Sequence, residues 1–580
     1  MGVMHMLAQY KLVARLYDGK ELVGYRLLDT SNNIMYDENI SNVKILAYKK
    51  RIQGVILDKA NRLRSNNGIY LSTYPKVKLF KNSISTFKTG EDLRDFCKIA
   101  DNYKHRYCYT RLLEYLKQPT SKVFTLYGLR RTGKTIMLLQ AAKELGYNNC
   151  VYISLNNDDS SYELLRTLKE YVSRGIKYIF IDEITALNNM LNFIATLADG
   201  FTIAGVHIVI SGTDSYMLKI ASEGALYDRC ILLNTTYVSF KEYNYLIGKT
   251  DIKDYIRYGG VLNRDDFYNQ SKVHEYINTS ISDNIQHSIE VSGRSKFGKI
   301  YDLINMGVLR HCIEATIQHT NEELSARILV ENFVSKDIGS LRELLSKPDR
   351  MGLSSNLDMN SIEEQIKYYL HCSNLEHFSD SYNLMLEYYD IFAEMLNILN
   401  LTIYIRHYID KKVSNNLLFV FPGLRYSQLK EGIIAFLDDV GFNEMNDKEQ
   451  EFILSKLESD ILGQMLEQVV LLELYNVFGF KRICKFNGIK AEEIDCVVKV
   501  NEEEIDLIEV KLSNKRDINQ CKHLINNEFT NRIEERMGYT VRNRIVVYTG
   551  EDSVVTYNNK EIRYFNANSF LMNIKEYLNK

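Results

Sequence analysis

The segment "GLRRTGKT", Gly128 to Thr135, constrains the fold of this chain more than any other stretch. It fits the pattern G-x-x-x-x-G-K-[ST], in which backbone N–H groups face a phosphate, the lysine reaches the β- and γ-phosphates and the hydroxyl meets Mg²⁺. The strand-like run "VFTLY" precedes it and the helical pattern "IMLLQAAKEL" follows, so that a helix N-terminus faces the anion. The alternative is an accidental glycine turn. The pattern predicts a nucleotide site made of Gly128, Arg131, Thr132, Gly133, Lys134 and Thr135.

Further strand-like runs follow this loop at spacings that leave room for helices. They are "NCVYISLN", "IKYIFIDE", "HIVISGT" and "RCILLN". Apolar runs that alternate with helical segments indicate a mainly parallel sheet flanked by helices. We therefore predict an α/β fold, with a P-loop NTPase domain and a helical lead-in over residues 76–250.

Acidic residues at the end of one predicted strand supply the second half of a nucleotide site. In "YIFIDEI", Asp182 could hold Mg²⁺ through water and Glu183 could orient and deprotonate the attacking water. Thr213, at the end of "HIVISGT", could sense the γ-phosphate or be an ordinary turn residue. Arg229, just before "CILLN", could neutralise charge on the γ-phosphate of its own or a neighbouring chain, or form a surface ion pair.

Composition limits the classes of protein that this chain can represent. At 580 residues it is too long for one core, and a net charge of −2 gives no overall basic footprint for coating nucleic acid. The cysteines form no C-x-x-C pair, which favours free thiols in a reducing compartment. No signal peptide and no apolar run long enough to span a bilayer stand out in the sequence. These features predict a cytoplasmic protein without a membrane partner.

The remaining pattern suggests three more regions. Residues 1–75 alternate apolar and polar positions, with a hairpin signal at Asp18-Gly19, and predict a small β-rich module of unknown role. Residues 251–435 have helical spacing, which fits either a winged-helix unit or a plain helical connector. Residues 436–580 begin with helices and continue with strands, as expected for a second α/β domain.

A second group of charged residues lies in "EEIDCVVKVNEEEIDLIEVKLS". Glu509 and Lys511 are two apart, so they share one face of a strand, and hairpin pairing would bring Asp495 beside them. Two carboxylates can bind a divalent metal, while a lysine can position water or stabilise charge during phosphodiester hydrolysis. Glu467, in the apolar helix "ILGQMLEQVVLLEL", could be a further ligand. The alternative is an amphipathic hairpin with a charged outer face.

With both groups in view, the chain resembles a prokaryotic family of AAA-type P-loop ATPases with a C-terminal restriction-endonuclease-like domain of the PD-(D/E)xK type. The likeness is in "GLRRTGKT", "YIFIDEI", "VISGTDSYML", "TYVSFKEYNYL", "YGG", "FVFPGLRY", "LGQMLEQVVLLEL" and the "EEID…IEVKLS" pair. It implies Walker-type roles for Lys134, Thr135, Asp182 and Glu183, and nuclease-like roles for Glu467, Asp495, Glu509 and Lys511. The proline that names the nuclease motif is absent, because Ile494 precedes Asp495.

These features favour an ATP-hydrolysing enzyme whose cycle controls a metal-dependent nuclease-like domain. Its cofactors would be ATP and Mg²⁺, with Mn²⁺ as an alternative at the nuclease-like site, and its substrate DNA or RNA. One alternative is a nucleotide-gated scaffold whose nuclease fold is inactive and serves binding. Another is a nucleotide-regulated transcription factor that uses the winged helix. A homo-oligomer, or a protein partner bound through the N-terminal module, fits any of the three.

Overall fold

The computed structural model describes the strands between residues 10 and 73, most of residues 87–317, residues 378–429 without 410–411 and 428, and residues 447–579 without 489–491. Within 87–317 the gaps are 157–158, 188, 215–217, 220–225, 249–250, 263–272, 274, 293–298, 306–307 and 314–315. The chain divides into two compact units, Met1–Thr86 with Asn156–Ser160 and Phe87–Leu155 with Ser161–Lys580. The eight cysteines in the described residues are free thiols.

The N-terminal unit is a β-sheet, as the alternation of its sequence predicts. Its strands are β1 (Tyr10–Asp18), β2 (Glu21–Asp29), β3 (Ile34–Asn39), β4 (Ile52–Gln53), β5 (Leu63–Arg64) and β6 (Ile69–Thr73). They pair in the order β3-β2-β1-β6-β5, and β4 pairs with β1. Strands β1 and β2 form an antiparallel hairpin in which Asp18 lies opposite Glu21. The predicted Asp18-Gly19 turn therefore joins two paired strands, although Gly19 itself is outside the described residues.

A five-stranded parallel sheet forms the first half of the second unit. Its strands are β7 (Val123–Tyr127), β8 (Cys150–Ser154), β9 (Tyr178–Asp182), β10 (His207–Gly212) and β11 (Cys230–Asn234), in the order β11-β7-β10-β9-β8. Each strand is one of the apolar runs predicted from sequence. Because all strands run the same way, the residues that follow β7, β9 and β10 meet at one edge of the sheet. The prediction of a P-loop NTPase sheet with flanking helices is confirmed.

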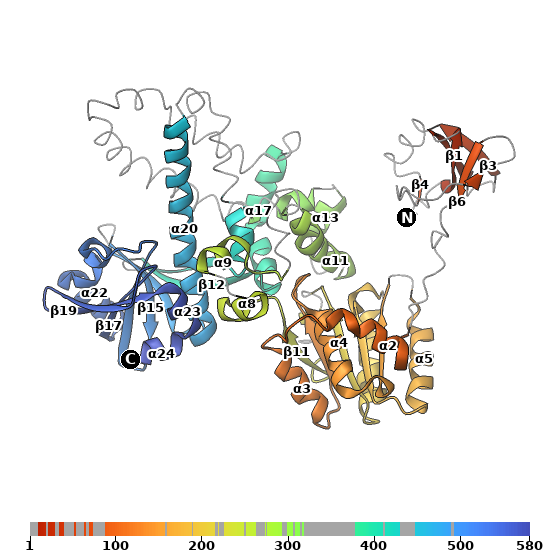
Figure 1. The fold of residues 1–580 in the computed structure, drawn as a ribbon, viewed down its shortest axis with the longest axis horizontal. Helices are drawn as coiled ribbons and strands as arrows, with labels where there is room; N and C mark the ends of the chain where they lie inside the picture. The colour runs from red at the N-terminus through yellow and green to blue at the C-terminus, as the bar shows by residue number, and fades with distance from the viewer. Residues whose placement is uncertain are drawn as a thin grey trace. The chain divides into compact units, whose positions relative to one another are not determined.

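Helices cover both faces of this sheet. Alternate residues of each strand face α2 (Gly90–Cys97), α3 (Tyr109–Lys117) and α4 (Lys134–Leu145) on one side. The others face α5 (Ser161–Ser173), α6 (Met190–Thr196) and the following turn, Leu197–Thr202. On β7, for example, Phe124 and Leu126 pack with α4, whereas Val123 packs with the α6 side. Figure 1 shows α4 lying over the sheet beside α2 and α3.

The region between the sheets contains helices and one hairpin. The helices are α8 (Phe240–Ile247), α9 (Ile252–Tyr258), α11 (Asp283–Ser292), α13 (Lys299–Asn305) and α17 (Phe378–Ile398). They are followed by β12 (Thr402–Ile409) and β13 (Lys412–Phe419), which pair antiparallel. The expectation of a helical region to residue 435 is therefore corrected, since residues 402–419 are strands. The winged-helix alternative concerns residues 361–399 of this region. Residues 361–377 lie outside the described part, and Phe378–Ile398 form α17.

The second half of the unit is a mixed sheet that includes this hairpin. Its strand order is β13-β12-β14-β15-β16-β17-β19-β18. The added strands are β14 (Ile483–Asn487), β15 (Glu493–Lys499), β16 (Glu504–Lys511), β17 (Thr540–Tyr548), β18 (Ser553–Tyr557) and β19 (Lys560–Asn566). Strand β12 pairs in parallel with β14, so the sheet crosses the boundary predicted at residue 436.

Helices sandwich this sheet as well. The long helix α20 (Asp447–Phe478), with α23 (Ala567–Met572) and α24 (Ile574–Asn579), packs on one face, where Val498, Ile508 and Val510 are buried. Helices α21 (Lys522–Ile525) and α22 (Asn527–Met537) pack on the other face, against Val497 and Leu507. Alternate side chains of β15 and β16 face the two covered sides of the sheet, so both strands are buried along most of their length.

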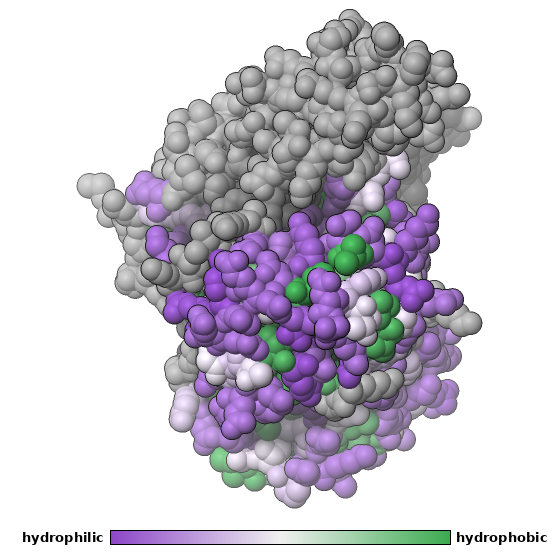
Figure 2. Space-filling view, turned by 90° about the vertical axis from the view of Figure 1, so that its left-hand side faces the viewer, coloured by the Kyte–Doolittle hydropathy of each residue, from purple (hydrophilic) through white to green (hydrophobic). Residues whose placement is uncertain are grey.

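Part of α20, Leu457–Phe478, is long and apolar enough to cross a membrane by length and composition. This corrects the expectation that no such run exists. Of the apolar window in this helix, 61% is buried inside the protein, as in a core helix. On the described part of the face in Figure 2, hydrophilic residues predominate and hydrophobic ones are scattered in small groups.

Candidate functional site

The loop between β7 and α4 has the backbone that a phosphate-binding loop needs. Gly128 and Gly133 have φ angles of 149° and 91°, a region that residues with a side chain rarely adopt. A Cβ on Gly128 would lie 2.6 Å from Thr235 Oγ1, so only glycine fits there. Arg131, in the same loop, also has a positive φ angle, 65°, although it is not a glycine. The sequence thus closes the loop tightly between the end of β7 and the first turn of α4.

Lys134, the first residue of α4, turns its ammonium group back into the loop. Its Nζ donates to the carbonyl oxygens of Gly128 at 2.8 Å and Leu129 at 2.9 Å. The side chain is 5% exposed, and burial lowers the pKa of Lys134 to about 8. The nearby Glu183 and Asp182 carboxylates act in the opposite direction on that pKa. The cation is therefore held among carbonyl dipoles, where a phosphate group would be a stronger partner.

The carboxylate of Asp182, at the end of β9, lies against Thr135. Thr135 Oγ1 donates to Asp182 Oδ2 at 2.6 Å, which brings together the two residues predicted to bind Mg²⁺. Tyr152 OH donates to the same oxygen at 2.9 Å, and the Ser211 hydroxyl donates to Oδ1. Sequence analysis missed the contribution of Tyr152, because its position in β8 looks like an ordinary core aromatic.

Glu183 follows Asp182 in a left-handed backbone conformation, with φ 56° and ψ 44°. This conformation is uncommon for a residue with a side chain, and backbone strain of this kind is often retained at active sites. Thr213 Oγ1 lies 3.4 Å from Glu183 Oε2, so the predicted phosphate-sensing residue contacts the predicted base. Burial and the adjacent Asp182 raise the pKa of Glu183, as suits a carboxylate that accepts a proton from water.

The other two predicted loop residues have different surroundings. Thr132 is buried, and its hydroxyl donates to Leu129 O at 2.9 Å and lies 2.8 Å from Thr235 Oγ1, so it braces the loop. The Arg131 guanidinium lies 6.0 Å from the centre of the Tyr276 ring, and Arg131 O accepts from Leu262 N at 3.1 Å.

Arg229 lies at the opposite edge of the sheet from the phosphate loop. Its carbonyl accepts from Val123 N, at the start of β7, whereas the loop follows the end of that five-residue strand, about 16 Å away. Its Nε donates to Asp199 Oδ1 at 2.9 Å in an exposed ion pair. The expectation that Arg229 reaches the γ-phosphate of its own chain is corrected. A role at a neighbouring chain stays a prediction.

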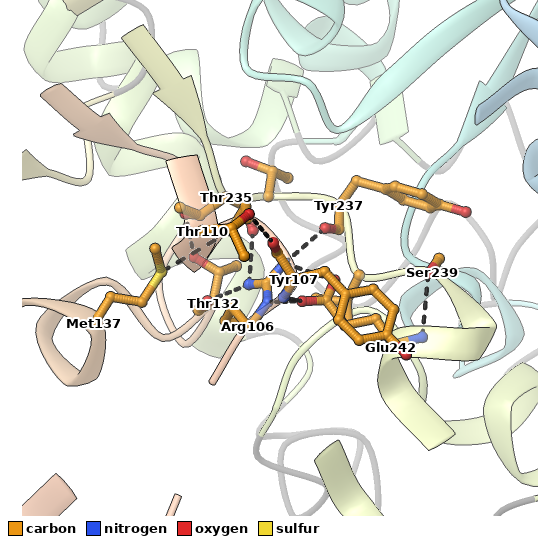
Figure 3. A network of polar contacts seen from close by, with 12 residues as sticks. Arg106, Tyr107, Thr110, Thr132, Met137, Thr235, Tyr237, Ser239 and Glu242 are labelled. Carbon is orange, nitrogen blue, oxygen red and sulfur yellow. Dashed lines mark hydrogen bonds and ion pairs between the residues drawn. The ribbon is translucent and has the colours of Figure 1, made fainter. Parts of the chain in front are cut away.

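A buried ion pair beneath the loop was not predicted from sequence. Arg106 Nε donates to Glu242 Oε1 at 2.7 Å, and the side chains are 4% and 7% exposed. The guanidinium also donates to Thr132 O in the loop, to Thr235 O at 3.2 Å and to Tyr237 O at 2.9 Å. Figure 3 shows these groups converging on Arg106. The pair joins residues 136 positions apart, so no local pattern could have revealed it.

A cavity of about 250 Å³ opens beside the start of α4. It is lined by Asn102, Tyr103, Lys104, Arg106, Arg131, Gly133, Ile136, Met137, Gln140, Leu246, Ile247 and Leu262. Because Gly133 belongs to both this cavity and the phosphate loop, a ligand with phosphates on the loop can place an apolar ring here.

The second predicted group of residues comes together between β15 and β16. Lys511 Nζ lies 2.6 Å from Glu509 Oε2 and 3.3 Å from Asp495 Oδ2, which also accepts from Val510 N at 2.7 Å. Glu509 is 3% exposed, and its Oε1 has no hydrogen-bond partner among the described residues. Burial, followed by the Asp495 charge, raises the pKa of Glu509. A buried carboxylate oxygen without a donor is the kind of atom that a metal ion satisfies.

Glu467 of α20 joins this group, together with two residues that sequence analysis missed. Lys485 on β14 forms ion pairs with Glu467 and with Glu493, the latter at 3.5 Å. Oxygen atoms of Glu467, Glu493 and Asp495 all lie within 4.8 Å of one another. Glu493 is two residues before Asp495 on β15, so the period of a strand could have indicated it.

Comparison with known proteins supports the first site. Residues 120–244 match the family model described as "AAA domain". An uncharacterized protein of Methanocaldococcus jannaschii, MJ1544, is 27% identical over 133 residues, which are 22% of this chain and 29% of that protein. The segment from β7 to the start of α8 is thus an AAA-type P-loop domain. The match spans under a third of the length of the curated relative.

Three solved structures show weaker likeness. PCH-2 of C. elegans is 18% identical, covering 34% of this chain and 55% of that one, with a TM-score of 0.19. AMPPCP-bound DnaA from Aquifex aeolicus is 14% identical, covering 52% and 90%, with a TM-score of 0.23. ORC1 of Aeropyrum pernix in complex with DNA is 14% identical, covering 58% and 95%, with a TM-score of 0.21. Likeness of this extent indicates neither a shared substrate nor a shared partner.

Nucleotide affinity should fall as the pH rises above about 8, where free Lys134 loses its proton. Bound phosphates would raise that pKa, so binding takes up a proton in this range and weakens by up to about tenfold per pH unit. Calorimetry with a non-hydrolysable ATP analogue, in buffers of different ionisation enthalpy, measures both effects. Lys134→Arg keeps its charge and should remove the dependence. An affinity that is constant from pH 7.5 to 9.5 in the wild type would contradict this.

Arg106→Met should destabilise the protein strongly, because it leaves Glu242 buried without its partner. Loss of one member of a buried pair costs about 3–5 kcal/mol, whereas replacing both is often nearly neutral. We expect a lower thermal midpoint for Arg106→Met, and recovery of stability but not of nucleotide affinity in Arg106→Met/Glu242→Leu. The control is Lys143→Met, which breaks the exposed Lys143–Asp101 pair and should leave the thermal midpoint nearly unchanged. Equal losses in both single variants would refute the special role of Arg106.

Proposed function

We propose that this protein binds and hydrolyses ATP at the Gly128–Thr135 loop, and that this cycle controls a metal-dependent nuclease-like site in its C-terminal half. The contact between Thr135 Oγ1 and Asp182 Oδ2 carries the first part, because it joins the loop to the acidic strand end. These two oxygen groups would hold Mg²⁺, which supplies positive charge to the phosphates. The cavity beside Gly133 would hold the adenine ring of the nucleotide.

The side chains around this point suit hydrolysis as well as binding. Lys134 would exchange the Gly128 and Leu129 carbonyls for phosphate oxygens and stabilise the charge that develops there. Glu183 would orient and deprotonate the attacking water, and Thr213 would hold the Glu183 carboxylate in place. The strained backbone of Glu183 and its raised pKa support this role.

The order of elements in the C-terminal half supports a restriction-endonuclease-like fold. Helix α20 is followed by the antiparallel strands β14, β15 and β16, then by α22, and then by β17, which is parallel to β16. This order places Asp495 on β15 and Glu509 and Lys511 on the neighbouring β16, as the resemblance requires for the three residues to act together. Asp495 and the unpartnered Oε1 of Glu509 would hold Mg²⁺ or Mn²⁺, and Lys511 would act on phosphodiester bonds of DNA or RNA.

Contacts within the second unit support coupling between the two sites. Glu242, the partner of Arg106, lies in the first turn of α8, and the N–H of Phe240 at the start of that helix donates to Glu473 Oε1 on α20. Glu473 is 2% exposed, so this acceptor is deep in the core. Glu467 lies on the same helix, about 9 Å along its axis from Glu473. A change at the phosphate loop can therefore reach a predicted metal ligand through one ion pair and two helices.

An alternative is a nucleotide-gated scaffold in which the C-terminal fold binds a partner without cleaving it. The ion pairs of Lys485 and Lys511 favour it, because they offset part of the carboxylate charge without a metal. The N-terminal sheet would then be a second surface for a protein partner or for another copy of the chain.

Glu183→Gln should bind ATP with near-normal affinity but turn it over at least about 100-fold more slowly, because a general base contributes 10²–10⁴-fold to rate. Lys134→Ala should instead lose affinity by about 100-fold or more, because it removes a charge-assisted contact to phosphate. Fluorescent-nucleotide titration and phosphate release separate the two effects. Thr196→Ala, at a solvent-exposed hydroxyl on α6, is the control. Wild-type turnover in Glu183→Gln would make this residue structural.

Asp495→Asn and Glu509→Gln should abolish divalent-dependent cleavage of DNA or RNA while ATP turnover continues, because the two sites use different residues. Lys511→Met should keep metal binding and lose cleavage, since its charge would act at the transition state. Cleavage of labelled DNA and RNA with Mg²⁺ or Mn²⁺ tests this. A wild type that binds nucleic acid without cutting it under any of these conditions would favour the scaffold.

The same assay tests coupling through α8 and α20. Glu473→Leu removes the acceptor for Phe240 N–H and should abolish the effect of ATP on cleavage or on nucleic-acid affinity. Glu473→Gln keeps an oxygen at this position and is the matched control. If both variants respond to ATP like the wild type, the signal does not pass through this contact.

A further inference from the structure

Lys485 occupies an unusual position for a lysine. It lies in the middle of β14 with its side chain 13% exposed, and its ammonium group is directed at two carboxylates, Glu467 on α20 and Glu493 on β15. Both of these carboxylates also lie near Asp495. A buried lysine can keep its positive charge only when carboxylates surround it. Lys485 therefore supplies a fixed positive charge inside the cluster.

The rest of the cluster is satisfied differently. Asp495 Oδ2 accepts from Val510 N and Lys511, and Glu509 Oε2 accepts from Lys511. Glu509 Oε1 has no partner in the described part of the chain, although Glu509 is 3% exposed. The cluster thus has one half in which Lys485 pairs with Glu467 and Glu493. In the other half, Lys511 pairs with Asp495 and Glu509, and one buried oxygen, Glu509 Oε1, still lacks a donor or a cation.

The charges of the cluster point to the number of metal ions it can take. Four carboxylates, those of Glu467, Glu493, Asp495 and Glu509, face the two ammonium groups of Lys485 and Lys511. With every group ionised, the cluster carries a charge of −2, which one divalent cation neutralises. A second divalent ion would leave a buried excess of +2, which a site of low dielectric constant does not tolerate.

We propose that Lys485 is a resident cation that occupies the place of a second metal ion, so that this site takes one divalent ion, held on the side of Asp495 and Glu509. This inference rests on the proposed metal-dependent function of the C-terminal half. It assigns Glu467 and Glu493 to Lys485 and not to the ion. Glu467, predicted as a metal ligand, would then act on the metal only through the charge and position of Lys485.

Titration with Mn²⁺ tests the number of ions. The titrations use the full chain with Asp182→Asn, which removes metal binding at the nucleotide site. Native mass spectrometry and calorimetry should then show one Mn²⁺ at the C-terminal site when that site is unchanged. In that background, Lys485→Met leaves the cluster at −3 and should bind a second ion or hold the first at least about tenfold more tightly. Two neighbouring Mn²⁺ ions would also give a spin-coupled electron paramagnetic resonance spectrum.

Two further variants control for misfolding and for the loss of a lysine elsewhere in the sheet. Lys485→Met/Glu467→Gln restores the charge to −2 and should return to one ion, even if Lys485→Met alone folds poorly. Lys499→Met, on β15, removes a lysine that contacts Tyr539 and no carboxylate of the cluster, and should leave Mn²⁺ binding unchanged. Two ions in the wild type, or unchanged Mn²⁺ binding in Lys485→Met, would overturn the inference about Lys485 but not the proposed metal-dependent function. No Mn²⁺ binding by the wild type would overturn the proposed metal function and the inference with it.

Discussion

The guanidinium of Arg106 joins the parts of the nucleotide-binding domain that sequence keeps far apart. Its N–H groups are directed at the phosphate loop through Thr132 O, at the segment after β11 through Thr235 O and Tyr237 O, and at α8 through Glu242. Only a planar group with several fixed donors can serve all of these acceptors at once, so lysine would not replace it. The shape of the loop therefore depends on a residue that precedes β7.

The same arrangement makes the loop part of a larger core. Leu129, inside the loop, belongs to one buried apolar cluster with residues of α9, α20 and the C-terminal sheet, such as Ile256, Leu466 and Ile508. Packing at this density transmits small displacements, because side chains in a filled core have few alternative positions. The contact of Glu473 with the start of α8 adds a polar link across that core. Burial raises the pKa of Glu473 to about 7, so its charge is sensitive to its surroundings.

Local patterns in the sequence predicted much of the first site and of the fold around it. The loop, the five parallel strands and the contact of Asp182 with Thr135 follow from spacing and from the rule that parallel strands end at one edge. That rule also contains the signal that Arg229, which precedes its strand, belongs at the other edge. Pairs distant in sequence, such as Arg106 with Glu242 and Glu467 with Lys485, leave no local trace. The strands at 402–419 were missed because the helical spacing predicted for residues 251–435 was extended across them.

The hairpin of β12 and β13 has a consequence for how the C-terminal half can exist. Strand β14 would be the edge of its sheet if β12 did not pair with it, and an uncovered edge presents free N–H and C=O groups that recruit strands from other molecules. The protecting strands come from a part of the chain that is synthesised before α20. A fragment that starts at residue 436 would lack them and would tend to aggregate. The C-terminal half therefore cannot be moved to another protein as a unit that begins at residue 436, and recombination that separates it from its neighbour would have to carry this hairpin along.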